Sequence, residues 1–345
     1  MNTNHSGVLF DKVLGCLAGG VIGDAMGTPT EKLSYEEIEA RFGWVTSFEG
    51  EGTDDSLLKH ILCETIFRAR GHPTADLWSE DWLRNAATFI DSKLFFVPVV
   101  NTFWKLRSDG VPPREAGSGN MASSSSAMCI SPMGIINAGN PRQAALETFE
   151  VTSLIHHNFC RDGACAMAAA VAEAFSPRAS VDSILDAAAR YLPDRSAQVM
   201  REALAATLAL ARDSGDYFEF RQRFHAQVPA TMHFTDSRET VPVALALVLL
   251  AQGDTEQAVI YGANFGRDAD TIASMAGAVA GALRGASAFP APWMERLGAQ
   301  AGKQRELAAR ITEVTVARAQ ASLEGARAVI ALAVATATPR AAGAA

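Results

Sequence analysis

The spacing of small residues near the two ends constrains the fold of this chain more than any other feature. Small residues recur at every fourth position in two stretches, at Gly15, Gly19, Gly23 and Gly27 and again at Ala273, Gly277, Gly281 and Gly285. Residues four apart share one face of a helix, and a glycine inside a helix costs about 1 kcal/mol relative to alanine. We expect that cost only where another backbone comes very close. The spacing therefore predicts two helices with bare ridges, packed tightly around one centre.

Small-residue ridges also join helices inside membranes, which is the competing interpretation. Charged residues in or beside the ridges argue against it, namely Asp11, Lys12, Asp24 and Arg284. No uninterrupted apolar span reaches the roughly eighteen residues of a membrane helix, and the first residues lack the basic and apolar segments of a secretory leader. The sequence therefore predicts a cytoplasmic protein with no membrane partner.

Charge and cysteine content exclude other classes of protein. The chain has 345 residues, with 30 basic and 38 acidic side chains and a net charge of −8. Without a basic run, nucleic acid is a poor partner. The five cysteines are odd in number and form no Cys-x-x-Cys pair, so we expect free, buried thiols.

Helical periodicity covers most of the chain, and no convincing alternating strand pattern occurs. The predicted helices span residues 10–26, 54–70, 80–91, 141–157, 160–176, 180–192, 196–212, 216–227, 240–252, 255–264, 271–284 and 291–330. We therefore predict one compact all-α domain over residues 1–310. Residues 311–345 are expected to form a C-terminal helix and a frayed or disordered alanine-rich tail.

Two acidic clusters open predicted helices, at residues 53–56 and 268–271. Their oxygen-bearing side chains are Thr53, Asp54, Asp55, Asp268, Asp270 and Thr271. Such residues can simply cap a helix and complement its dipole. If folding brings the clusters together, these hard oxygen ligands suit Mg²⁺, Mn²⁺ or Ca²⁺. Two ions about 3.5–4 Å apart would then form a binuclear site.

Three motifs in order resemble the ADP-ribosylglycohydrolase family, over roughly residues 8–300. Residues 19–31 are similar to its opening helix and the loop with its mobile glutamate. Residues 53–56 resemble its Thr-Asp-Asp-Thr/Ser element. Residues 263–273 resemble its Gly-Gly-Asp-Thr-Asp-Thr element, with Arg267 and Ala269 as variants.

The resemblance implies a many-helix orthogonal bundle and a metal-dependent glycohydrolase. It implies two Mg²⁺ (or Mn²⁺) ions held by the six residues of the acidic clusters. Glu31, which could otherwise be an ordinary solvated carboxylate, would be the general acid or base.

A Gly/Ser-rich stretch, residues 117–129, is similar to the family's substrate loop, although composition alone also fits a flexible linker. The candidate substrate-binding residues are Ser118, Gly119, Asn120, Ser125, Ser126 and Met128, with His157 and Arg267 elsewhere. Arg267 could instead be an ion-pair partner. Cys129 replaces the family's arginine, so a bidentate anion-binding group is lost.

Three functions remain open from the sequence. The first is a hydrolase that removes ADP-ribose from a protein side chain or conjugate. The second is a hydrolase of the same fold acting on a smaller N- or O-glycoside, such as a nucleoside-like metabolite. The third is a non-catalytic binding or structural descendant, against which the complete set of carboxylates argues. The expected partner is accordingly a small ribosyl substrate or an ADP-ribosylated protein.

Overall fold

Two antiparallel helices that are far apart in the sequence lie at the centre of the structure. These are α1 (Val8–Gly27) and α16 (Ala269–Arg284). A Cβ atom placed on Gly19 would lie 2.3 Å from the carbonyl oxygen of Gly277, and one on Gly23 would lie 2.2 Å from that of Ala273. The predicted ridges therefore do face each other. Gly285 lies just past α16, at its C-cap with a φ of 93°.

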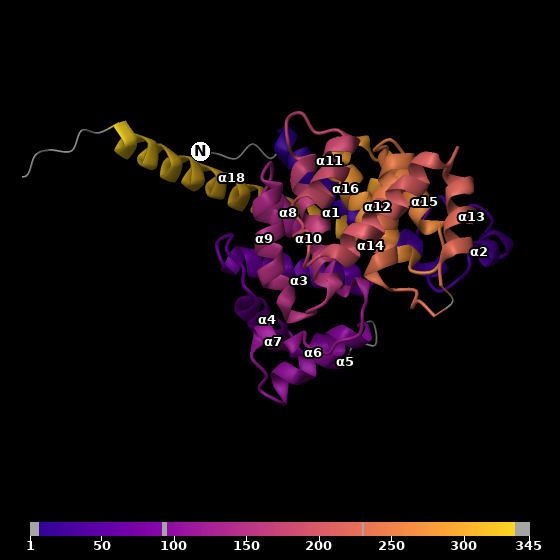
Figure 1. The fold of residues 1–345 in the computed structure, drawn as a ribbon, viewed down its shortest axis with the longest axis horizontal. Coiled ribbons are helices and arrows are strands. Elements are labelled where there is room, and N and C mark those ends of the chain that lie inside the picture. The colour runs from indigo at the N-terminus through magenta and orange to yellow at the C-terminus, as the bar shows by residue number, and fades with distance from the viewer. Residues whose placement is uncertain (1–6, 92–94, 230, 335–345) are drawn as a thin grey trace, which may run out of the picture.

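The computed structural model describes residues 7–91, 95–229 and 231–334, and in these ranges every regular element is a helix (Figure 1). The predicted all-α fold is confirmed. The central pair is packed against α3 (Asp54–Arg68), α8 (Ser131–Ile136), α10 (Phe159–Ala174), α14 (Ser237–Leu250), α15 (Thr255–Ala263) and α18 (Ala299–Val334). Further out lie α2 (Tyr35–Phe42), α9 (Pro141–Val151), α11 (Val181–Arg190), α12 (Gln198–Asp213), α13 (Tyr217–Gln227) and α17 (Ala291–Arg296).

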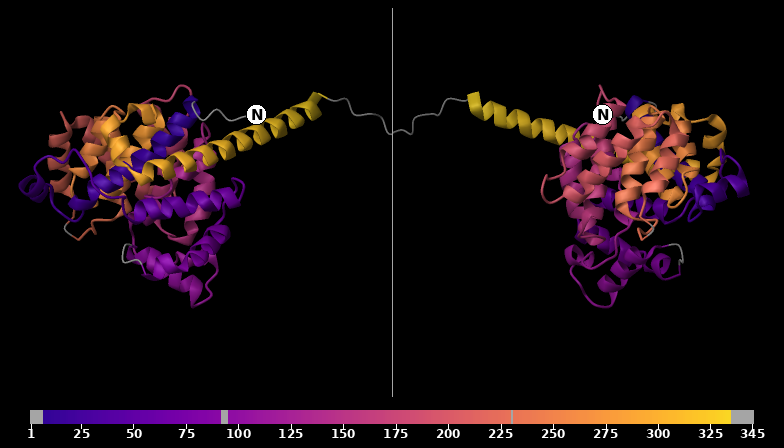
Figure 2. Two further views of the ribbon diagram at one scale, coloured as in Figure 1. Left: turned by 180° about the vertical axis from the view of Figure 1, so that it is seen from behind. Right: turned by 45° about the vertical axis from the view of Figure 1, so that its right-hand side comes forward.

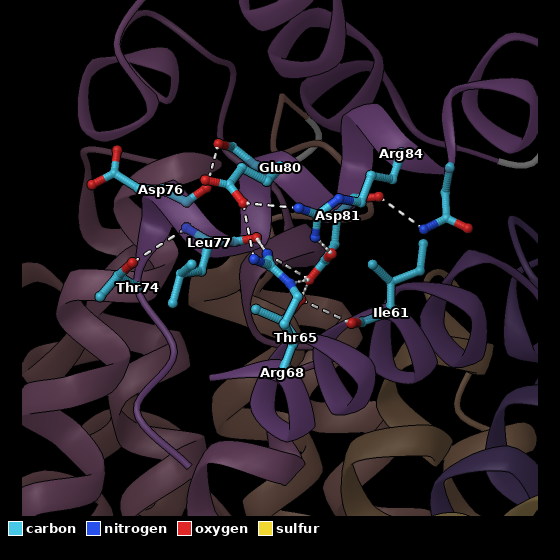
Figure 3. A network of polar contacts seen from close by, with 11 residues as sticks. Ile61, Thr65, Arg68, Thr74, Asp76, Leu77, Glu80, Asp81 and Arg84 are labelled. Carbon is cyan, nitrogen blue, oxygen red and sulfur yellow. Dashed lines mark hydrogen bonds and ion pairs between the residues drawn. The ribbon is translucent and has the colours of Figure 1, made fainter. Parts of the chain in front are cut away.

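A lobe on one side of the body contains α4 (Ala75–Arg84), α5 (Ala86–Asp91), α6 (Val97–Arg107) and α7 (Pro113–Ala116) (Figure 1). Asp81 of α4 joins this lobe to α3, since it accepts hydrogen bonds from Thr65 at 2.7 Å and from Arg68 at 3.0 Å (Figure 3). Inside the lobe the Phe89 ring stacks on Phe95, with centroids 4.5 Å apart. The lobe therefore fixes the segment that begins at Phe95, which reaches the candidate site.

Several helix boundaries differ from those predicted. The segments 80–91 and 291–330 each contain a break, because a turn at residue 85 separates α4 from α5 and a turn at residues 297–298 separates α17 from α18. The helices α2, α6, α7 and α8 were not predicted. Three of them have eight residues or fewer, too few to show a clear period, whereas α6 was overlooked although Val99, Phe103 and Leu106 form a helical apolar face. The C-terminal tail predicted beyond α18, residues 335–345, lies outside the described residues. Within the described part of the chain, no helix is long and apolar enough to cross a membrane.

Candidate active site

A cavity of about 360 Å³ opens where the C-terminal end of α1 meets the N-terminal ends of α3 and α16. It is lined by Thr28, Glu31, Lys32, Thr53, Asp54, Asp55, Phe95, Phe96, Ser124, Ser125, Met128, Thr235, Asp268, Asp270 and Thr271. All six residues of the two acidic clusters are therefore brought together, although more than two hundred positions separate the clusters. Glu31, Ser125 and Met128 lie in the same cavity.

The first cluster is held by a buried carboxylate of α1 rather than by capping its own helix. Asp24 is fully buried, and it accepts hydrogen bonds from the backbone N–H and the hydroxyl of Thr53, both at 2.9 Å. It also accepts one from the Ser56 hydroxyl at 2.6 Å. Thr53 is the N-cap of α3, yet its side chain makes no capping hydrogen bond. Because its proton goes to Asp24, the Thr53 oxygen keeps lone pairs free for the cavity.

The second cluster lies against the loop that bears Glu31. Ligand oxygens of Glu31, Asp268 and Asp270 lie within 4.8 Å of one another. The Ser124 hydroxyl donates to Asp268 at 2.9 Å. Asp268 is the N-cap of α16, and like Thr53 it makes no side-chain capping bond. Capping thus does not explain the residue type at either position.

The loops around Glu31 and Asp268 are joined by backbone hydrogen bonds. The N–H of Lys32 donates to the carbonyl of Arg267 at 2.7 Å, and the N–H of Arg267 donates to the carbonyl of Leu33 at 2.8 Å. The Arg267 side chain points elsewhere. It pairs with buried Glu239 at 2.7 Å and donates to the Met232 carbonyl at 3.0 Å. Arg267 is thus an ion-pair partner, and it does not line the acidic cavity.

Burial and mutual repulsion disfavour the ionised form of the clustered carboxylates. Burial raises the pKa of Asp54 to about 7. It also raises the pKa values of Asp55, Asp268 and Asp270 well above the usual aspartate range, and the neighbouring carboxylates add to the shift. Asp55 Oδ2 is buried without a hydrogen-bond partner. Buried oxygen atoms of this kind, close together and partly unpaired, are the donor set that hard divalent cations require.

One buried cation lies below these carboxylates. Lys59 of α3 is fully buried, its ammonium donates to the Ser274 hydroxyl at 3.3 Å, and its charge lowers the pKa of Asp24 against the larger effect of burial. A Cβ on Gly20 would lie 2.4 Å from the Lys59 Nζ atom. Gly20 therefore makes room for this lysine.

An aromatic rim borders the cavity on the other side. The Phe96 ring lies 5.5 Å from the ring of His233 and 6.5 Å from that of Phe234. The Lys32 ammonium lies 5.6 Å from the Phe234 ring and forms a 3.0 Å ion pair with Glu31. Flat rings beside a polar cavity suit the stacking of a planar group.

The other predicted substrate-binding residues lie away from the acidic cavity. Ser118 shares a 3.3 Å hydrogen bond with His157, and both residues are exposed. Gly119 has a φ of 75°, as its turn requires. Asn120 is buried, and its amide donates to Thr102 and Ile155. Ser126 shares a 2.6 Å hydrogen bond with buried His156. These residues shape the loop behind the cavity wall.

Several residues at the cavity had no predicted role in the site. Lys59 and Phe96 were overlooked because their roles depend on packing, and neither belongs to a motif. The signal for Lys59 was its position one turn after Asp55, together with an additional glycine, Gly20, beside the ridge of α1. Ser124 belongs to the Gly/Ser-rich stretch, but only its contact with Asp268 distinguishes it from its serine neighbours.

Comparisons with known proteins point to one family. The profile of the ADP-ribosylglycohydrolase family matches residues 5–336. The chain is 29% identical to the uncharacterized protein YegU of Escherichia coli K12, over 81% of this chain and 89% of that protein. It is 23% identical to the ADP-ribosylarginine hydrolase Tri1 of Pseudomonas putida, over 84% of this chain and 74% of that protein.

A third relative is the ADP-ribosyl-[dinitrogen reductase] glycohydrolase of Rhodospirillum rubrum, 23% identical over 84% of this chain and 91% of that protein. A solved structure titled ADP-ribosylglycohydrolase-related protein complex superposes with a TM-score of 0.69, at 20% identity, over 89% of this chain and 99% of that one. The structural likeness shows the shared fold.

Proposed function

This chain belongs to the ADP-ribosylglycohydrolase family of hydrolases, and from that premise we propose a divalent-metal-dependent glycohydrolase that cleaves a ribosyl C1–N or C1–O bond. Its substrate is ADP-ribose attached to a protein side chain or another conjugate. One observation carries the proposal: the carboxylates of Glu31, Asp54, Asp55, Asp268 and Asp270 line a single cavity.

Two Mg²⁺ or Mn²⁺ ions fit the residues present. Thr53, Asp54, Asp55, Asp268, Asp270 and Thr271 would hold them, and the unpartnered Asp55 Oδ2 has no other role in the described structure. When bound, such ions orient the ribose hydroxyls and a water molecule and stabilise developing charge. They would also relieve the repulsion among the four aspartates.

Glu31 is the proposed proton-transfer group. Its side chain is 26% exposed, it lies at the open side of the acidic cluster, and its carboxylate is oriented by Lys32. Ribosyl transfer to water passes through an oxocarbenium-like state, which needs a proton taken from water or given to the leaving group. The backbone link between Lys32 and Arg267 fixes this loop relative to Asp268.

Turnover of a substrate panel tests the proposal. Purified protein is incubated with ADP-ribosyl-arginine, an ADP-ribosyl-serine peptide and O-acetyl-ADP-ribose, with Mg²⁺, with Mn²⁺ and with EDTA. We expect release of ADP-ribose with metal and its loss in EDTA. Equal rates in EDTA and Mg²⁺ would refute the metal requirement.

A smaller N- or O-glycoside is the second candidate substrate, and one observation favours it. Cys129, which stands where the family has an arginine, is fully buried. Among the described residues that line the cavity, Lys32 is the only basic one, and it is paired with Glu31. A diphosphate would therefore find no free cationic side chain there. Hydrolysis of nucleosides by a protein that leaves all ADP-ribosyl compounds intact would support this candidate.

A further inference from the structure

The last part of α18 projects from the body of the molecule. The helix runs from Ala299 to Val334, and its first half packs against the core through buried Leu307, Ala308 and Ile311. Every residue from 319 to 333 is exposed. Figures 1 and 2 show this end of the helix, in yellow, standing clear of all other elements. At 1.5 Å per residue the exposed part is about 22 Å long.

The projecting segment has the composition of a contact surface. Leu323, Val329, Ile330 and Leu332 are 50%, 67%, 65% and 76% exposed. Over residues 319–333 the only charged side chains are Glu324 and Arg327, which are opposite in sign. A solvated helix normally carries a polar face of several charges. The segment therefore presents apolar surface and no net charge, although the whole chain carries −8.

Large and small residues alternate in a seven-residue pattern along one face of α18, from half-buried Val316 to exposed Ala333. Val316, Leu323 and Ile330 recur every seventh residue, and an alanine follows three positions after each, at Ala319, Ala326 and Ala333. These are the a and d positions of a heptad repeat, the spacing by which two helices supercoil around each other. The face is thus built to meet another helix.

The pattern complements itself only when the second helix runs the opposite way. In an antiparallel pair an a position meets a d position, so Leu323 faces Ala326 of the other copy. In the same register Ile330 faces Ala319 and Val316 faces Ala333. Every layer then contains one large side chain and one alanine. A parallel pair would instead alternate layers of two large residues with layers of two alanines, which leaves voids that destabilise packing.

We propose that residues 316–333 of α18 form an isologous homodimer interface, an antiparallel helix pair with a second copy of this chain. The base of the projection is held firmly, because Arg318 pairs with Glu147 at 2.8 Å and donates to Asn137 at 3.0 Å. The helix therefore presents its face in a fixed direction. Two helices in contact over this length bury less than the roughly 1,600 Å² of a standard interface. The dimer is accordingly in concentration-dependent equilibrium with the monomer.

Sedimentation velocity of the full chain over a concentration series tests the proposal. We expect the dimer fraction to rise with concentration in the wild type, and Leu323→Glu/Ile330→Glu to be monomeric throughout with unchanged circular dichroism. Leu332→Glu is the control, because Leu332 is more exposed than Leu323 and Ile330 but lies on the opposite side of the helix. A wild type that is monomeric up to its solubility limit overturns the proposal, as does equal dissociation by Leu332→Glu.

Cross-linking tests the direction of the pair. All five native cysteines are buried, so an oxidant should form disulfides only between the introduced surface thiols. Ala319→Cys/Ile330→Cys should oxidise to a covalent dimer, whereas each single variant should not, because the two positions meet only across an antiparallel pair. Disulfide formation by Ala319→Cys alone would indicate parallel helices and overturn the register. Dimers that survive Leu323→Glu/Ile330→Glu would locate the interface elsewhere and overturn the proposal.

Discussion

Lys32 donates its backbone N–H to the carbonyl of Arg267 at 2.7 Å, and both residues have left-handed backbones, with φ of 68° and 61°. This is the point where the loop of Glu31 and the loop of Asp268 meet. A non-glycine residue held at positive φ costs of order 1 kcal/mol. At Arg267 the ion pair with Glu239 offsets that cost.

Two substitutions of Arg267 separate the contribution of its ion pair to stability from the cost of its left-handed backbone. Arg267→Ala leaves Glu239 buried and unpaired, so it should lower the free energy of unfolding by about 1–3 kcal/mol. This range lies between the free-energy costs of breaking exposed and buried ion pairs. Arg267→Gly removes the same ion pair but accepts positive φ, so it should be about 1 kcal/mol more stable than Arg267→Ala. Urea unfolding in EDTA measures both. Equal stability of the two variants would show that the backbone at residue 267 is unstrained.

The contact between Gly19 and Gly277 predicts that neither accepts a side chain. A Cβ on either residue would lie 2.3 or 2.4 Å from the other's carbonyl oxygen, and backbone at the centre of a helix pair has little room to move. Gly19→Ala and Gly277→Ala should each cost at least about 3 kcal/mol. Gly302→Ala in α18 is the control, since nothing lies within 4 Å of its added methyl group, and it should gain up to about 1 kcal/mol. Thermal unfolding of the three variants checks the ranking.

How far the sequence predicts this architecture depends on the kind of interaction. The pairing of α1 with α16 was predictable because a small residue at every fourth position lines one helix face, and such a bare face indicates close contact with another helix. The convergence of Asp54 and Asp55 with Asp268 and Asp270 followed from the resemblance rather than from spacing. Lys59, by contrast, depends on space left by Gly20 and on Ser274, three residues from three helices that no local pattern connects.

The wall of the cavity was less predictable for a related reason. Asn120 was predicted to bind substrate because of its place in a loop motif. Its side-chain amide instead donates hydrogen bonds to Thr102 and Ile155 inside the protein. Loop conformation is set by such tertiary hydrogen bonds, and composition alone does not determine it.

Asp24 and Asp268 should respond to the same substitution in opposite ways. Asp24→Asn loses acceptor capacity for Thr53 and Ser56, so the metal-free protein should lose about 1–3 kcal/mol of stability. Asp268→Asn removes one of several repelling carboxylates and should leave the metal-free protein as stable or more so. It should also reduce the rise in melting temperature on adding Mn²⁺ more than Asp24→Asn does. Equal Mn²⁺ responses in the two variants would contradict the proposed ligand set.

The contribution of the clustered carboxylates to stability without metal should fall as pH rises. Burial raises the pKa of Asp54 to about 7, and raises those of Asp55, Asp268 and Asp270. Because the folded state then holds more protons than the unfolded state, these groups favour folding below about pH 4, and this contribution is lost as pH rises through about 7. Mn²⁺ binds the ionised carboxylates, so its stabilising effect should be larger at pH 8 than at pH 5. Melting curves with EDTA and with Mn²⁺ at both pH values check this, and a metal effect independent of pH would contradict it.

Glu31→Gln tests the role of the carboxylate at the open side of the cluster. The amide keeps the shape of the side chain but transfers no proton, so turnover of the accepted substrate should fall by about 10²–10⁴-fold. Because Glu31 lies within 4.8 Å of Asp268 and Asp270, it could alternatively be a metal ligand. The two roles predict different responses of Glu31→Gln to Mn²⁺. If Glu31 is an acid or base, the variant keeps the Mn²⁺-induced rise in melting temperature; if Glu31 is a metal ligand, that rise is reduced.

Lys32→Met is the matched control, because it removes the ion pair with Glu31 but leaves the carboxylate, and it should lower turnover far less. Wild-type turnover in Glu31→Gln would remove Glu31 from the mechanism, even though the family assignment would stand.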